Sequence, residues 1–99
     1  MGSQVDFAVR KTEKLKEPSD FKVVLLNDDY TSMDFVVDVL VLIFNKNEAD
    51  AERIMMDVHR KGRAVVGVYT RDIACTKAGQ VHSLAKQNDF PLRCVIEPS

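Results

Sequence analysis

Three polar residues follow directly on an apolar segment of this chain. The segment 21–26 is followed by Asn27, Asp28 and Asp29. These residues supply an amide oxygen and two carboxylates, and no lysine or arginine lies beside them. Neighbouring acceptors of this kind repel one another unless a cation lies between them, and the ammonium group of a ligand would suit that position. The same residue types are common where a strand turns toward a helix, because they bond free backbone N–H groups. A purely structural turn is therefore the alternative interpretation.

His59 could complete a set of three acceptors. An asparagine oxygen, a carboxylate and a neutral imidazole nitrogen match the three donors of an ammonium group. His59 follows Met55 by one turn of a predicted helix, at the edge of an apolar stripe. The ammonium hypothesis requires the fold to bring His59 beside Asn27. Otherwise His59 is a favourable charge at a helix C-terminus, and Met55 and Val58 are ordinary core residues.

The sequence gives weaker indications of other chemistry. Asp28, Asp29, Asp34 and His59 could in principle bind a metal ion, but the acidic run lacks the glycine of a calcium loop and the paired spacing of a zinc site. His82 has no partner at ligand spacing, and the chain contains no nucleophile motif or cofactor fingerprint. We therefore predict a binding protein without cofactor or metal, not an enzyme. The alternatives are a general protein-interaction domain and a metal-dependent hydrolase that uses the Asp/His group.

Composition narrows the class of protein. The 99 residues are 45% hydrophobic, which suits one domain with a modest core. The 14 Lys and Arg against 15 Asp and Glu form no basic stripe, which favours protein or peptide partners over nucleic acid. The longest apolar run, 35–44, which only Asp38 interrupts, is about half of the roughly 20 residues that a membrane-spanning helix needs. The first residues lack a signal-peptide pattern, and Cys75 and Cys94 lack the spacing of a metal site or disulfide framework. We expect a cytoplasmic protein with no membrane partner.

Hydrophobic periodicity and capping residues predict six elements in the order β-α-α-β-α-β. The predicted strands are 21–26, 63–69 and 90–97. The predicted helices run from Met33 to about Phe44, from after Asn47 to Lys61 with Gly62 just beyond, and from after Thr70 to about Lys86. This order predicts a small α+β domain at 20–99, with a three-stranded antiparallel sheet packed against three helices. Residues 1–19 are charge-mixed and poor in large apolar residues, which predicts a flexible N-terminal tail.

The first two predicted helices differ in their apolar pattern. The first helix, which Thr31 or Ser32 can cap, carries two stripes and is predicted to be covered on two sides. One stripe contains Met33, Val36, Val37, Leu40 and Phe44, and the other contains Phe35, Val39 and Leu42. The second helix carries a single stripe that is predicted to be its buried face, formed by Ala51, Ile54, Met55 and Val58.

Four blocks of the sequence resemble the ClpS family of adaptors, which hand N-degron proteins to the Clp unfoldase-protease. The blocks are Asn27-Asp28-Asp29-Tyr30-Thr31-x-Met33-x-Phe35-Val36, then Met55-x-x-Val58-His59-x-x-Gly62, then Gly67-Val68-Tyr69-Thr70, and finally Pro91-Leu92 with Cys94 close behind. They occur in the family's order, and the resemblance covers about Phe21 to Glu97. Ser32 departs from the proline often found at its position.

The resemblance implies that the domain at 20–99 binds the free N-terminus of proteins that begin with Phe, Leu, Tyr or Trp. It implies delivery of these proteins to the AAA+ unfoldase ClpA for degradation by ClpP, with no cleavage by the adaptor. Asn27, Asp29 and His59 would hold the α-ammonium group, and Asp28 would add charge and contacts near the first peptide group. The first side chain would enter an apolar pocket lined by Met33, Val36, Met55, Val58 and Leu92. Asp72 and Lys77 would dock on the unfoldase's N-terminal domain, and residues 1 to about 19 would form a tail used for delivery.

Overall fold

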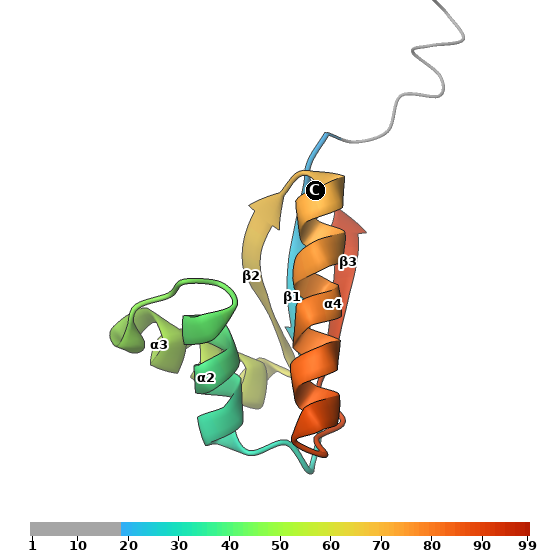
Figure 1. Cartoon of the computed structure of the whole chain (residues 1–99). Coiled ribbons are helices and arrows are strands. Elements are labelled where there is room, and N and C mark those ends of the chain that lie inside the picture. The colour runs from blue at the N-terminus through green and yellow to red at the C-terminus, as the bar shows by residue number, and fades with distance from the viewer. Residues whose placement is uncertain (1–18) are drawn as a thin grey trace, which may run out of the picture.

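A computed structural model describes residues 19–99 of the chain. The predicted tail therefore lies, except for Ser19, outside the described residues. The described residues fold in the predicted order β-α-α-β-α-β (Figure 1). The elements are β1 (Phe21–Leu26), α2 (Met33–Leu42), α3 (Glu48–Lys61), β2 (Arg63–Tyr69), α4 (Arg71–Gln87) and β3 (Arg93–Pro98). The predicted α+β class, with three helices and a three-stranded antiparallel sheet, is confirmed.

β1 is the central strand of the sheet, whose order is β2-β1-β3. Its three middle residues, Val23, Val24 and Leu25, are fully buried, as expected for a β-branched and leucine-rich run between two neighbours. Helix α4 runs along the sheet, whereas α2 and α3 pack against each other beside β2 (Figure 1). Because Leu26 pairs with Arg63, the end of β1 lies next to the start of β2 and hence to the end of α3. This corner of the fold holds the polar run that follows β1.

The helix boundaries have local causes in the sequence. Ser32, and not Thr31, caps α2, because its hydroxyl accepts from the Phe35 N–H at 3.1 Å. Asn47 caps α3 as predicted, accepting from the Asp50 N–H at 2.8 Å. Gly62 ends α3 in the left-handed conformation, with φ of 89°, which glycine adopts without steric cost.

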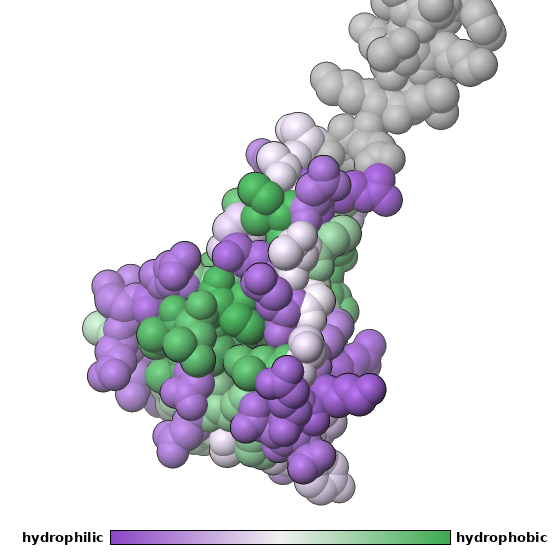
Figure 2. All heavy atoms as spheres, in the orientation of Figure 1, coloured by the Kyte–Doolittle hydropathy of each residue, from purple (hydrophilic) through white to green (hydrophobic). Residues whose placement is uncertain are grey.

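The predicted buried face of α3 is confirmed, but α2 differs from its prediction. Helix α2 ends at Leu42, before the predicted end at Phe44. Leu42 is 68% exposed, so the expectation that its stripe is covered is wrong at this position. The chain leaves the helical path here, since Asn45 has a φ of 56° and the Lys46 N–H bonds back to the Leu40 carbonyl. Figure 2 shows that apolar side chains gather over α2 on this face, surrounded by hydrophilic ones.

The last strand begins at Arg93, three residues later than predicted. Asp89 has a φ of 60°, and Pro91 has no N–H to give to a ladder, so the chain turns before it pairs. Phe90 packs against Phe35 instead, with ring centroids 4.8 Å apart. Within β3, the Cys94 N–H donates to the imidazole Nε2 of His82 in α4 at 3.0 Å.

Within residues 19–99, no helix is long and apolar enough to cross a membrane. The same part of the chain holds no cluster of three or more His, Cys, Asp or Glu residues that could bind a metal ion. Both cysteines are free thiols, with Cys75 exposed and Cys94 buried.

Candidate functional site

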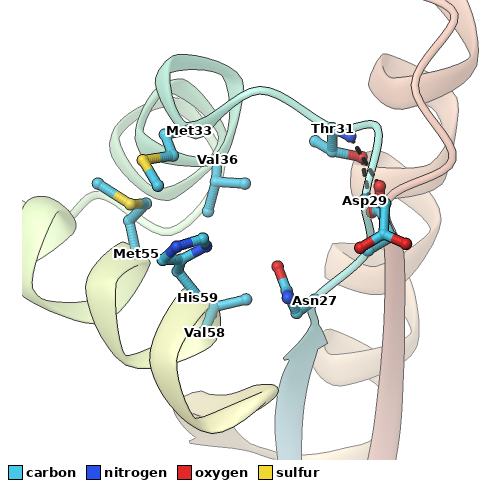
Figure 3. Close-up of a pocket in the computed structure, with 9 residues that line it drawn as sticks. Asn27, Asp29, Thr31, Met33, Val36, Met55, Val58 and His59 are labelled. Carbon is cyan, nitrogen blue, oxygen red and sulfur yellow. Dashed lines mark hydrogen bonds between the residues drawn. The ribbon is translucent and has the colours of Figure 1, made fainter.

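A cavity of about 210 Å³ lies at the corner where β1, α2 and α3 meet. Its walls come from the loop after β1, the first turns of α2 and the last two turns of α3 (Figure 3). The lining residues are Asn27, Asp28, Asp29, Thr31, Met33, Val36, Met55, Val58 and His59. The fold therefore brings His59 to the acidic turn, which was the requirement that the ammonium hypothesis placed on it.

The loop is attached to the end of α3 through the backbone. The Asn27 N–H donates to the Gly62 carbonyl at 2.9 Å, immediately after the last turn of α3 that carries His59. Because a backbone hydrogen bond fixes both position and direction, Asn27 is held at one side of the cavity and His59 at another. Segments that are far apart in the sequence thus form one rim.

Asp28 is bound within the loop. One carboxylate oxygen accepts from the backbone N–H groups of Tyr30 and Thr31, at 2.8 and 2.7 Å, and the other accepts from the Thr31 hydroxyl at 2.7 Å. Partial burial by itself would raise the pKa of Asp28, but the bonds from Thr31 and Tyr30 outweigh it and leave that pKa below its usual value. Asp28 therefore has the structural role that the alternative interpretation gave to this turn, because it bonds free backbone N–H groups.

The other three acceptors differ from Asp28 because their side chains have no partner among residues 19–99. They are Asn27, Asp29 and His59. All three side chains are exposed, and none of them makes a hydrogen bond or an ion pair with another group in the described part of the chain. Figure 3 shows Asn27 and Asp29 on the loop side of the cavity, with the His59 imidazole between Asn27 and Met55. Their acceptor atoms are free to bind a ligand that carries hydrogen-bond donors.

The helix side of the cavity is apolar. Val36, Met55 and Val58 are buried members of the core that turn part of their surface to the cavity. Met33 stands in the first turn of α2 and is 43% exposed, which is high for a large apolar side chain. Figure 3 shows the side chains of Met33 and Met55 next to each other. The cavity therefore joins a polar rim to a soft apolar wall.

Three predicted residues lie elsewhere. Leu92 is buried in the hydrophobic core and is not among the described residues that line the cavity. Asp72 is exposed in the first turn of α4. The Lys77 ammonium donates to the Ile43 carbonyl at 2.8 Å and lies 5.8 Å from the ring centres of Phe44 and Tyr69, so it binds the end of α2.

The sequence prediction did not include Thr31 as a pocket residue. Thr31 lines the cavity and donates to Asp28, whereas the sequence suggested it only as a possible cap of α2. An aspartate three residues before a threonine at the end of a strand is the available signal, because Asp often bonds backbone N–H groups two or three residues later.

Comparison with known proteins identifies the family of this chain and agrees with its fold. The family described as "ATP-dependent Clp protease adaptor protein ClpS" matches residues 16–95. A relative in Acetivibrio thermocellus, named ATP-dependent Clp protease adapter protein ClpS, is 59% identical over 83 residues, which are 84% of each chain. A relative of the same name in Paraburkholderia phymatum is 57% identical over 88 residues, covering 89% of this chain and 85% of the relative.

A solved structure extends the comparison to three dimensions. It is that of Agrobacterium tumefaciens ClpS2 bound to L-phenylalaninamide, and it superposes with a TM-score of 0.80 at 48% sequence identity. The match covers 84% of this chain and all of the other. Sequence and structure together show that the chain belongs to the ClpS family, the adaptors of the ATP-dependent Clp protease.

Proposed function

We propose that this protein binds the free N-terminus of proteins whose first residue is Phe, Leu, Tyr or Trp, and delivers them to the AAA+ unfoldase ClpA for degradation by ClpP. The observation that carries the proposal is a cavity with free acceptors on one side and an apolar wall on the other. The ligand of the Agrobacterium tumefaciens relative supports it, because L-phenylalaninamide combines a free α-ammonium group with a phenyl side chain.

The α-ammonium group would be recognised by the acceptors of Asn27, Asp29 and His59. An ammonium group has three donors, and a neutral imidazole nitrogen, an amide oxygen and a carboxylate can each accept one. Asp28 would contribute mainly negative charge and loop order, since its two oxygens already accept three hydrogen bonds within the loop. An acetylated N-terminus loses the charge and two of the donors, so the site should reject it.

The first side chain would lie against Met33, Val36, Met55 and Val58. A volume of about 210 Å³ is smaller than the roughly 300–1,000 Å³ of pockets that hold drug-sized ligands, which favours one side chain over a longer segment. Burying a Phe side chain contributes about 1.5–3 kcal/mol, and each charge-assisted hydrogen bond contributes about 1.5–3 kcal/mol. Association costs of several kcal/mol leave an affinity of roughly micromolar order, which permits release of the cargo. Leu92, which lies in the core and does not line the cavity, would contribute to the pocket only indirectly, through core packing.

Delivery would use other parts of the chain. We propose that Asp72 and Lys77 belong to the surface that docks on the N-terminal domain of ClpA, and that residues 1 to about 19 precede the adaptor domain at 20–99 as its delivery tail. Asp72 is exposed and able to make such a contact directly. Contact through Lys77 would share or replace its bond to the Ile43 carbonyl. A cytoplasmic location fits this role.

Binding of short peptides tests the proposal. Peptides that begin with Phe and differ only in a free or acetylated α-amino group are titrated into the protein, and a Gly-initiated peptide with a free amino group serves as the matched control for the side chain. We expect binding of the free Phe peptide only. Equal binding of the acetylated peptide would favour a general interaction domain, and peptide cleavage that depends on added metal would favour a hydrolase.

A further inference from the structure

The three methionines in the described part of the chain differ in their access to solvent. Met55 is 8% exposed and Met56 is partly buried against the core, whereas Met33 is 43% exposed at the mouth of the cavity. A thioether that is exposed to solvent is oxidised more readily than a buried one, so Met33 is the one of these three that an oxidant reaches most readily. Met33 also lines the cavity, so oxidation of its sulfur would change the surface offered to a ligand.

We propose that Met33 is a site of reversible oxidation that switches off binding in this cavity. The inference rests on the proposed function, because it concerns the apolar pocket for the first side chain of a peptide. In the reaction, a hydroperoxide transfers one oxygen atom to the Met33 sulfur. The thioether is oxidised by two electrons to a sulfoxide, and hydrogen peroxide is reduced to water.

The surroundings of Met33 make a sulfoxide unfavourable for an apolar ligand. A sulfoxide oxygen is a hydrogen-bond acceptor, and the neighbouring wall of Val36, Met55 and Val58 offers it no side-chain donor. Covering that oxygen with a phenyl ring would remove its water without replacing the lost hydrogen bonds.

The polar rim does not relieve this conflict. The Thr31 hydroxyl already donates to Asp28, and the Asp29 carboxylate is itself an acceptor. Asn27 and His59 also line the cavity and carry N–H donors, but a bond from either to the sulfoxide would tie a side chain of the ammonium site to Met33. Either arrangement weakens ligand binding.

Controlled oxidation of the full-length protein tests the proposal. The protein is treated with hydrogen peroxide, then with a dithiol to reverse oxidation of Cys75, and peptide mapping by mass spectrometry reports the sulfoxide at each methionine. Affinity for a Phe-initiated peptide is measured by fluorescence anisotropy before and after. The untreated protein must bind first, so failure there would count against the proposed function and not against the switch. We expect Met33 to oxidise before Met55 and Met56, and the affinity to fall by about tenfold in step with Met33 sulfoxide.

Two variants and a protection experiment complete the test. Each variant is compared with itself before and after peroxide. Met33→Leu should keep its own starting affinity, because leucine has no sulfur to oxidise. Met56→Leu should lose affinity as the parent does. In the parent, bound peptide should slow oxidation of Met33 but not of Met56, and methionine sulfoxide reductase should restore binding. Full affinity with Met33 completely oxidised, equal peroxide sensitivity in Met33→Leu, or no protection by bound peptide would each overturn the proposal. Because the protection experiment uses the parent protein, it still tests the proposal if Met33→Leu fails to bind the peptide.

Discussion

The backbone N–H of Asn27 donates to the carbonyl of Gly62, across 2.9 Å. Gly62 holds that carbonyl in place with a φ of 89°, the left-handed conformation that also ends α3. The distance between the loop and His59 therefore depends on a residue that has no side chain. One backbone conformation sets the spacing of the acceptors at the rim.

Replacing Gly62 tests this dependence. A Cβ at Gly62 would meet nothing within 4 Å, so Gly62→Ala introduces backbone strain without a clash. We expect a loss of about 1–2 kcal/mol in the free energy of unfolding, measured by urea denaturation, together with weaker peptide binding. Gly79→Ala is the matched control, because Gly79 lies inside α4 and an added Cβ there also meets nothing. That variant should be as stable as the parent or more so and should bind normally; similar losses in both variants would contradict the argument.

Removing single acceptors should weaken ligand binding without unfolding the protein. Asp29→Ala and His59→Ala each delete an exposed group with no partner among the described residues, so we expect the affinity for a Phe-initiated peptide to fall by more than about tenfold. Melting temperatures should stay close to that of the parent. Asp38→Ala, at an exposed position of α2 that does not line the cavity, is the control. Unchanged affinity in both site variants would refute the ammonium assignment.

Met33 should exclude β-branched first residues. Met33 lines the cavity. The resemblance to the ClpS family implies that it presses against the β-carbon of the ligand's first residue, so a second substituent on that carbon would collide with it. We expect Met33→Ala to bind Ile- and Val-initiated peptides while it keeps binding to Phe and Leu. Anisotropy titrations with a set of peptides that differ in the first residue measure this selectivity. A variant that rejects Ile and Val as the parent does would place the selectivity elsewhere.

Thr31 should control the ionisation of Asp28. Its hydroxyl is one of three donors to this carboxylate, and the bonds together hold the pKa of Asp28 below its usual value. Thr31→Val should raise that pKa toward the ordinary range and lower the free energy of unfolding at pH 7 by about 1 kcal/mol.

The dependence on pH has a defined sign. A lowered pKa in the folded state contributes stability above the ordinary pKa of 3.8, and that contribution is lost as the pH falls through the lowered value. The difference between parent and Thr31→Val should therefore shrink in strong acid. An NMR titration of the Asp28 carboxyl group, with the exposed Thr76→Val variant as control, measures the shift; an identical titration curve in Thr31→Val would rule out this role of Thr31.

The tail should separate binding from delivery. The cavity is built from residues 27–59, so removal of residues 1–17 should leave peptide affinity unchanged. We expect the truncated protein to bind ClpA but not to accelerate degradation of a Phe-initiated substrate by ClpA and ClpP. Equal degradation rates with the full-length and truncated proteins would mean that the tail is not needed for delivery.

Much of the fold could be predicted from local chemistry, as α3 illustrates. Asn47, the single apolar stripe and Gly62 marked its start, its buried face and its end, because each acts within a few residues of the chain. Leu42 could not be predicted in the same way, since its exposure depends on how α2 packs against the rest of the fold and not on the residues beside it in the chain. The site shows the same division. Residue types suggested the acceptors, but contacts between distant segments, the pairing of β1 with β2 and the bond from Asn27 to Gly62, bring them to His59.

The bond from the Cys94 N–H to His82 concerns a hazard of sheet proteins. β3 is an outer strand, and unpaired backbone groups along such a strand can recruit an extended chain and begin aggregation. The imidazole of His82 accepts from one of these backbone groups, the Cys94 N–H, and so reduces the capacity of this edge to pair with another chain. A protein proposed to deliver substrates to an unfoldase works close to unfolded, extended polypeptides. Because the Cys94 N–H is already bonded to His82, the edge of its sheet has one backbone donor fewer with which such a chain could pair.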